Sequence, residues 1–186
     1  MSDTLEVIKT RYACRDFDGS PIPDETLREI CYAGLCAPSA MNRQPWRIIL
    51  VKDKAKVDAL DAQGMAKLAA TNPTAHKRMM DRGGTLFYNA SALVVVAKEL
   101  DAPIAAELDC GIVTANLVLA AKALAVDSVV HGFAAVVLEG EESAELKQQL
   151  GFPEGFDFAI AVLLGYASGE AKAPHTPDLE KFIEVG

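Results

Sequence analysis

The sequence has little positive charge, few aromatic side chains and no long hydrophobic run. It contains 18 Lys and Arg against 26 Asp and Glu, which gives a formal net charge of -8. This balance provides no general attraction for nucleic-acid phosphates or anionic lipid. The nearest approach to a membrane span, Ala90 to Ala97, has the length of a strand, whereas a bilayer requires roughly 20 apolar residues. We therefore expect a soluble protein without nucleic-acid or membrane partners.

Targeting, disulfide and metal signals are also missing. Residues 1–4 contain no basic region followed by an apolar stretch, so we expect neither a signal peptide nor a transit peptide, and a cytoplasmic location. Only three His are present, without an acidic partner at a fixed spacing, which argues against a metal site. The cysteines form no CxxC pair and are expected to be free thiols without a catalytic role: Cys14, Cys31, Cys36 and Cys110.

Length and composition indicate one domain over residues 1–186. A chain of 186 residues with 51% hydrophobic content can bury one substantial core but not two. The tail over residues 167–186 contains Pro174, Pro177 and many charges, with too little apolar surface to fold on itself. We predict that this tail lies across a partner subunit.

Hydrophobic periodicity predicts helices that alternate with short strands. Helices are expected near residues 5–8, from 23 to a stop at Pro38, and over 54–70, 104–124 and 142–150. A polar region without an assigned element follows the third of these, through His76 and Arg82. Strands are expected over 47–51, 92–96 and 158–164, with a strand or extended turn at 128–130. This alternation fits an α+β and an α/β domain equally well.

The segment from Arg11 to Phe17 places two arginines near a helix end in an otherwise acidic chain. Arginine gives bidentate, permanently charged contacts to phosphate or to the electron-rich edge of a heterocycle. The alternative is a pair of surface cations matched with nearby acids, and the segment taken alone favours that alternative.

A polar loop with two prolines and the only Trp runs from Ala37 to Arg47. Such a loop can present hydroxyl, amide and backbone groups to a planar polar ligand. The alternative is an ordinary turn with Trp46 as a core anchor. We expect Trp46 to be in the core, whereas an ordinary turn does not explain Ser39 and Asn42.

Two further segments carry isolated polar residues. Asp109 and Asn116 interrupt an apolar helix and are expected to be structural, while Gly111 allows close approach of another backbone, as at a dimer or helix interface. His131 follows a strand and precedes Gly132, where the main chain can approach a ligand ring without side-chain chemistry.

Taken in order, these segments resemble the FMN-dependent nitroreductase family over nearly the whole chain. Residues 11–15 are similar to the Arg-rich flavin motif of that family, residues 38–46 to its Pro-Ser-Ser loop, and residues 109–117 to its central dimer helix. Residues 152–155 and 164–166 are similar to its closing segment. The resemblance implies an α+β fold with a mainly antiparallel central sheet flanked by helices, and an intertwined homodimer with two FMN sites built from both subunits.

The resemblance also implies which residues bind the cofactor. Arg11 and Arg15 would contact FMN, Ser39 and Asn42 would reach the FMN of the other subunit, and the backbone at residues 130–132 would lie along the flavin N5 edge. Alanines occupy two positions where serine is common, and a histidine stands in a tail region where the family often has Lys or Arg. The implied set is Arg11, Tyr12, Ala13, Arg15, Pro38, Ser39, Ala40, Asn42, Val130, His131, Gly132 and His175.

The implied activity is an FMN-dependent oxidoreductase that uses NADH or NADPH and reduces a flat acceptor, a nitroaromatic or a quinone, by a ping-pong mechanism. No side chain is expected to act as a catalytic acid or base, because the flavin carries the chemistry. Two alternatives stay open. One is other flavin chemistry, namely dehalogenation, heterocycle dehydrogenation or flavin breakdown; the other is a flavin-binding sensory protein with little turnover.

Overall fold

Within the residues that the computed structural model describes, 3–102, 105–170 and 172–185, a four-stranded antiparallel sheet forms the centre. The strand order is β1-β2-β4-β3, so that the two longest strands lie in the middle. The predicted α+β fold with an antiparallel sheet is therefore confirmed. The strands are β1 (Trp46–Val51), β2 (Ala92–Glu99), β3 (Asp127–Val130) and β4 (Phe156–Gly165).

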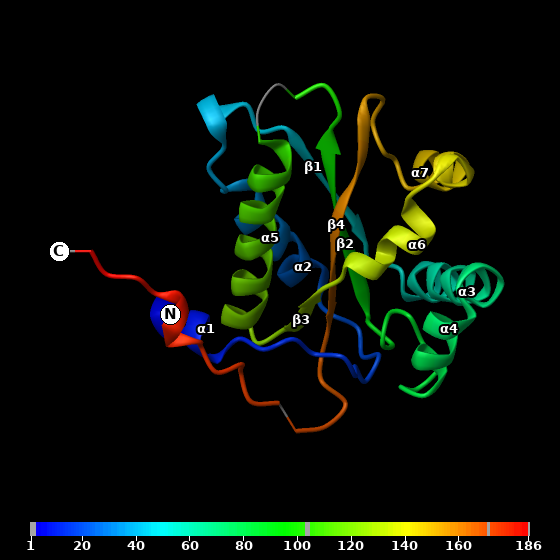
Figure 1. The fold of residues 1–186 in the computed structure, drawn as a ribbon, viewed down its shortest axis with the longest axis horizontal. Coiled ribbons are helices and arrows are strands. Elements are labelled where there is room, and N and C mark those ends of the chain that lie inside the picture. The colour runs from blue at the N-terminus through cyan, green and yellow to red at the C-terminus, as the bar shows by residue number, and fades with distance from the viewer. Residues whose placement is uncertain (1–2, 103–104, 171, 186) are drawn as a thin grey trace.

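Helices cover both faces of the sheet (Figure 1). Helices α2 and α5 pack together on one face, and α3, α4 and α6 lie on the other. The α-helices are α1 (Thr4–Thr10), α2 (Asp24–Leu35), α3 (Lys54–Thr71), α4 (Pro73–Met80), α5 (Ala106–Ala123), α6 (Ala135–Leu138) and α7 (Ala144–Gln149), and the short 3-10 turns are η1 (Ala40–Asn42), η2 (Gly132–Ala134), η3 (Glu141–Ser143) and η4 (Leu179–Lys181).

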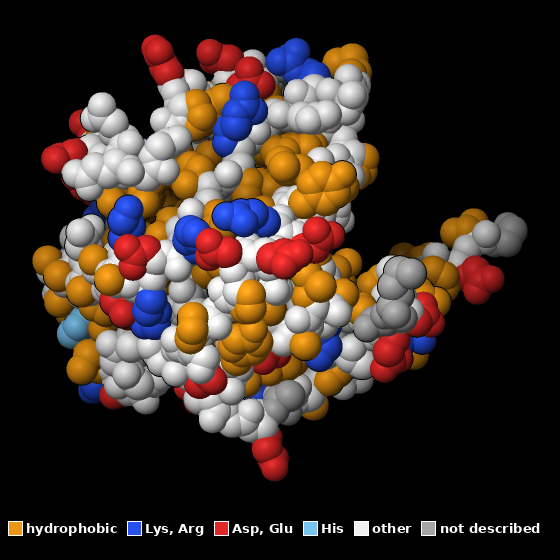
Figure 2. Space-filling view, turned by 180° about the vertical axis from the view of Figure 1, so that it is seen from behind, with side chains coloured by type: hydrophobic (Ala, Val, Ile, Leu, Met, Phe, Trp, Pro, Cys, Tyr) orange, Lys and Arg blue, Asp and Glu red, His pale blue; other side chains and the backbone are white. Residues whose placement is uncertain are grey.

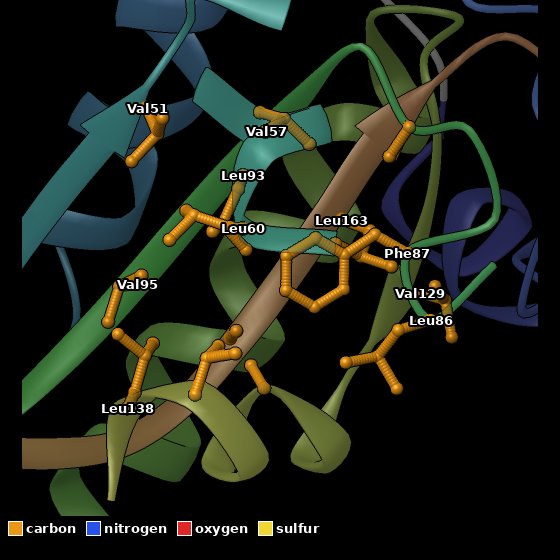
Figure 3. Packing of buried hydrophobic residues seen from close by; sticks show 14 of the residues in the cluster. Val51, Val57, Leu60, Leu86, Phe87, Leu93, Val95, Val129, Leu138 and Leu163 are labelled. Carbon is orange, nitrogen blue, oxygen red and sulfur yellow. The ribbon is translucent and has the colours of Figure 1, made fainter. Parts of the chain in front are cut away.

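The central strands are apolar throughout because both of their faces are buried. Leu93 and Val95 of β2 belong to the cluster beneath α3 and α6, which Figure 3 shows. Val94 and Val96 point the other way, into the cluster with α2 and α5. Full burial of a Val or Leu side chain contributes about 1.5–3 kcal/mol to folding. This packing explains why the sequence of β2 does not alternate between apolar and polar residues.

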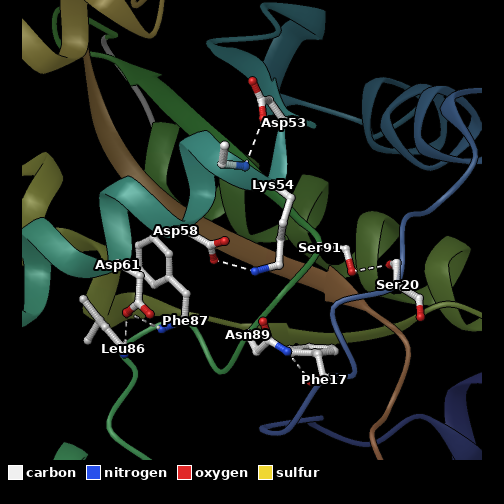
Figure 4. Close-up of polar contacts among 11 residues, drawn as sticks. Phe17, Ser20, Asp53, Lys54, Asp58, Asp61, Leu86, Phe87, Asn89 and Ser91 are labelled. Atoms are coloured by element: carbon white, nitrogen blue, oxygen red, sulfur yellow. Dashed lines mark hydrogen bonds and ion pairs between the residues drawn. The ribbon is translucent and has the colours of Figure 1, made fainter.

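Side-chain caps fix where three helices begin. Asp3 accepts a hydrogen bond from the amide of Leu5, and Asp53 accepts one from Ala55 (Figure 4). Asn72 caps α4 in the same way, with Pro73 at the first helical position, which suits a residue without an amide hydrogen. Helix α4 lies in the polar region to which no element was assigned from the sequence. Its start is marked by the Asn72 cap, and no apolar stripe along the helix signals it.

Helix α5 is 18 residues long and carries the predicted small-residue surface. Its predicted first residue, Ile104, lies outside the described residues. No helix in the described part of the chain is long and apolar enough to span a bilayer. Trp46 is 2% exposed, as predicted for a core anchor.

Candidate functional site

The extended segment after α1 is fixed at the edge of the sheet by backbone contacts. The amide of Cys14 donates to the carbonyl of Ser128, at 3.0 Å. The amide of Phe17 donates to the carbonyl of Tyr88, also at 3.0 Å, and the Phe17 ring is buried. Arg15 lies between these two anchors, and its side chain is exposed. The sheet edge therefore sets the backbone position of Arg15.

A cavity of about 860 Å³ opens beside Arg15. It lies within the size range of sites that hold small molecules and cofactors, about 300–1,000 Å³. Three of its lining side chains are cations, Arg15, Arg82 and Lys172, although the chain as a whole is acidic. None of these three takes part in an ion pair with another described residue. The cavity therefore offers unneutralised positive charge to an anionic ligand.

A smaller cavity of about 60 Å³ adjoins the first and shares Arg15, Asp16 and Lys172 with it. Tyr12 lines this smaller cavity, and its side chain is 8% exposed. Burial raises the pKa of Tyr12, and the nearby carboxylate of Asp127 raises it further. The hydroxyl of Tyr12 consequently stays protonated and neutral at physiological pH.

The opposite wall of the large cavity is held in place by polar contacts with the rest of the chain (Figure 4). One carboxylate oxygen of Asp61 accepts from the amides of Leu86 and Phe87, at 2.5 and 3.1 Å. The Asn89 side chain donates to the Phe17 carbonyl at 3.0 Å. The pKa of Asp61 is raised, because its burial outweighs the two amide donors. These contacts join the wall that contains residues 82–89 to the wall that contains Arg15.

His131 lies at the end of β3 with its imidazole turned inward. The side chain is 4% exposed and packs edge-on against the rings of Phe87 and Tyr88, at centroid distances of 5.4 and 5.6 Å. Burial lowers the pKa of His131 to about 4, and the positive charge of Arg15 adds to that shift. Val130 before it is 44% exposed, and Gly132 after it is also exposed. A ligand at this strand end would meet main chain and Val130, and not the imidazole.

The loop over residues 37–44 is a rigid turn against α5. The amide of Ala40 donates to the buried carboxylate of Asp109 at 3.4 Å, and the hydroxyl of Ser39 accepts from the amide of Gln44 at 2.9 Å. Asn42 accepts from the Gln44 side chain at 3.0 Å. Asn42 and Gln44 have φ values of 55 and 51°, in the left-handed region that non-glycine residues seldom adopt.

The polar residues of α5 have structural partners, as the sequence predicted. Asp109 holds the loop over residues 37–44, and the Asn116 side chain donates to the carbonyl of Ala33 in α2 at 3.0 Å. A methyl group at exposed Gly111 would meet no heavy atom of its own chain within 4 Å. Gly111 is therefore free for contact with another chain.

The two halves of the predicted site lie at opposite ends of α5. The loop over residues 37–44 is bonded to Asp109 near the start of α5, whereas the Arg15 segment is bonded to Ser128 in the strand that follows it. At 1.5 Å per residue, an 18-residue helix is about 27 Å long. One chain therefore does not bring Ser39 and Asn42 close to Arg15. Nor does Arg11, which ends α1, line the large cavity.

The C-terminal tail reaches the cavity through Lys172, three residues before the predicted His175. His175 is exposed and does not line the large cavity. Farther along, the tail projects from the body of the molecule (Figures 1 and 2). Four of its apolar side chains are 74–88% exposed: Leu179, Phe182, Ile183 and Val185. Such apolar exposure is typical of a surface that packs on another chain.

Sequence reasoning missed Arg82, Tyr88, Asn89 and Lys172 as lining residues of the cavity. A signal was present for the two cations, since each stands in a polar segment of an acidic chain. For Tyr88 and Asn89 the sequence gives no signal, because only the chain's long-range folding brings them opposite Arg15.

Two of the cysteines lie where burial disfavours the thiolate that a nucleophile requires. All four are free thiols. Burial raises the pKa values of Cys31 and Cys110 to about 11, so their thiolate forms are disfavoured. Cys31 is partly buried, and Cys110 is fully buried.

A model of the nitroreductase family matches residues 8–166 of this sequence. The chain belongs to the nitroreductase family. A crystal structure of a nitroreductase with bound FMN from Desulfitobacterium hafniense DCB-2 superposes with a TM-score of 0.92 at 40% identity, over 100% of both chains. A nitroreductase with bound FMN from Bacteroides fragilis NCTC 9343 gives 0.86 at 26% identity, again over 100% of both chains. A curated protein of Archaeoglobus fulgidus, provisionally named NADH dehydrogenase/NAD(P)H nitroreductase, is 31% identical over 91% of this chain and 88% of its own length.

Proposed function

We propose that this family member is an FMN-dependent oxidoreductase that passes electrons from a reduced nicotinamide to a flat acceptor, a nitroaromatic or a quinone. The observation that carries the proposal is the cavity of about 860 Å³, into which Arg15 and Lys172 present unneutralised charge. The FMN in the two related crystal structures supports the choice of flavin.

The described residues fit a flavin mononucleotide. Its phosphate carries about two negative charges at neutral pH and needs cationic or amide donors. Lys172 supplies such a cation from the C-terminal tail. Val130 and Gly132, the exposed residues on either side of buried His131, provide an edge that a planar ring can approach. When bound, FMN would supply the electron-transfer chemistry that no side chain here provides.

The side chains of this site would bind and orient the flavin rather than transfer protons. His131 is buried and has a pKa near 4, so it is neutral at physiological pH and stands away from the exposed strand end. The guanidinium of Arg15 would hold the electron-rich pyrimidine edge of the ring. A site of this kind needs no acid or base side chain.

We propose further that the active unit is a homodimer. Ser39 and Asn42 lie at one end of α5 and Arg15 at the other, so a flavin that contacts all three needs two chains. The exposed surface of α5 around Gly111 and the projecting apolar tail offer the contact areas. One accessible flavin face used in turn by donor and acceptor would give ping-pong kinetics.

The test begins with the purified protein and added FMN. We expect a yellow protein with about one FMN per chain and steady oxidation of NADH or NADPH when a quinone or nitroarene is added without oxygen. Initial rates with both substrates varied should give parallel double-reciprocal lines, and light scattering at micromolar protein should give a dimer. A chain that does not take up FMN contradicts the cofactor assignment, and a flavin-loaded protein without turnover on an acceptor panel contradicts the activity. An active, flavin-loaded monomer contradicts the shared site.

A further inference from the structure

Arg82 is the cation in the large cavity that the proposed flavin contacts do not require. It follows α4, where its amide donates to the carbonyl of Met79 at 3.0 Å. Gly83 and Gly84 come next, with φ values of 111 and 76° that suit only glycine. The amide of Gly84 donates to the same Met79 carbonyl at 3.0 Å. The turn that carries Arg82 is thus fixed by backbone bonds and glycine geometry.

The guanidinium of Arg82 has no acidic partner in an ion pair with another described residue, and its side chain is exposed. Arg43 and Arg47, by contrast, are occupied: Arg43 lies 3.7 Å from Glu99, and Arg47 lies over the ring of Phe156 at 4.5 Å. Arg82 consequently presents its full charge to whatever enters the cavity.

The cavity cations divide into two groups by position. Arg15 and Lys172 line both the large cavity and the small one beside Tyr12, together with Asp16, the single acid among the described lining residues of the large cavity. Arg82 lines only the large cavity, from the wall that precedes β2. The charge of Arg15 also adds to the lowering of the His131 pKa that burial causes. The proposed flavin contacts therefore belong to the Arg15 group, and Arg82 lies apart from them.

We propose that Arg82 forms a subsite for an anionic group on a substrate that enters beside the flavin, either the 2′-phosphate of NADPH or a carboxylate of the acceptor. Guanidinium binds both groups through paired hydrogen bonds, which gives orientation as well as attraction. A cavity of about 860 Å³ has room for more than a phosphate group. The inference rests on the proposed function, because it needs a flavin in place.

The experiment compares Arg82→Gln with the control Arg78→Gln, which removes an exposed cation from α4 without touching the cavity. FMN dissociation constants are measured first, by flavin fluorescence. KM values are then measured for two substrate pairs that differ in charge: NADPH against NADH, and 4-nitrobenzoate against 4-nitrobenzamide. Binding of the two nitro compounds is also followed without turnover, by the change they cause in the absorbance of oxidised flavin.

We expect the FMN dissociation constant of Arg82→Gln to stay within threefold of the parent value. In one of the two substrate pairs, the preference for the more negatively charged member should fall about tenfold, and that pair identifies the source of the anion. Arg82→Lys should recover part of that preference. Two results overturn the inference: FMN affinity lowered tenfold or more, which assigns Arg82 to the flavin phosphate, or unchanged preference in both pairs. A parent protein that binds no FMN refutes the proposed function instead, and is recognised before any variant is compared.

Discussion

Replacing Arg15 with Ala should weaken FMN binding without disturbing the fold. The side chain is exposed, and the neighbouring backbone is held independently through Cys14 and Phe17, so truncation removes a charge and little packing. A charge-assisted hydrogen bond contributes about 1.5–3 kcal/mol, and about 1.4 kcal/mol corresponds to a tenfold change in affinity. The FMN dissociation constant should therefore rise by roughly 10- to 150-fold.

The assay is a titration of apoprotein with FMN, followed by flavin fluorescence at fixed ionic strength. Arg28→Ala is the matched control, because Arg28 is exposed and pairs only with Asp24, 3.7 Å away on the same helix. The FMN dissociation constant of Arg15→Lys should lie between those of Arg28→Ala and Arg15→Ala, since lysine keeps the charge but not the fork of donors. An Arg15→Ala dissociation constant within twofold of the parent value would remove Arg15 from the flavin site.

Three further predictions concern the packing around the site. His131→Ala should keep turnover within about tenfold when FMN is bound, because the imidazole is buried; a loss of several orders of magnitude would make it a proton donor. Because the pKa of folded His131 is about 4 against an ordinary 6.5, the unfolded chain binds the proton first as pH falls. This residue should therefore lower the free energy of unfolding by roughly 3 kcal/mol between pH 6.5 and pH 4. Denaturant titrations at both pH values should show this loss in the parent protein and not in His131→Gln. Gly165→Ala would bring a methyl group to 2.6 Å from the buried Phe17 ring and should lower the free energy of unfolding by about 1–3 kcal/mol. Gly169→Ala, whose methyl group would meet no heavy atom of the described residues within 4 Å beyond its chain neighbours, should leave the free energy of unfolding unchanged in the same denaturant titration.

Most of the fold could be predicted from the sequence because the apolar segments differ clearly in length and pattern. The continuous run in β2 indicated a strand buried on both faces, and Trp46 indicated a core position. Helix α4 was missed because its composition is polar, and only the Asn72 cap and Pro73 signal its start. Short α6 was missed because four residues carry no helical period.

The candidate site was less predictable, since it is assembled from distant segments. Local composition singled out the Arg15 segment and the strand end at His131, whereas their role in flavin binding is implied only by the family resemblance and stays a prediction. Arg82 and Lys172 were not found, because the polar composition of their segments marks them as exposed cations but does not say which cavity they line. The separation of Asn42 from Arg15 along α5 also has no sequence signal, since it depends on where two loops attach to one helix.

The length of α5 has a consequence for mixtures of chains that carry different substitutions in the site. If every flavin is held by Arg15 of one subunit and by the loop over residues 37–44 of the other, a dimer of two differently damaged chains keeps one intact site and has one site with both defects. Unfolding and refolding an equal mixture of Arg15→Ala and Asn42→Ala chains would then restore about a quarter of the sites to the parent form. Neither variant alone could do so. Loss of function in this protein would thus be a property of chain pairs, and two inactive versions could rescue each other.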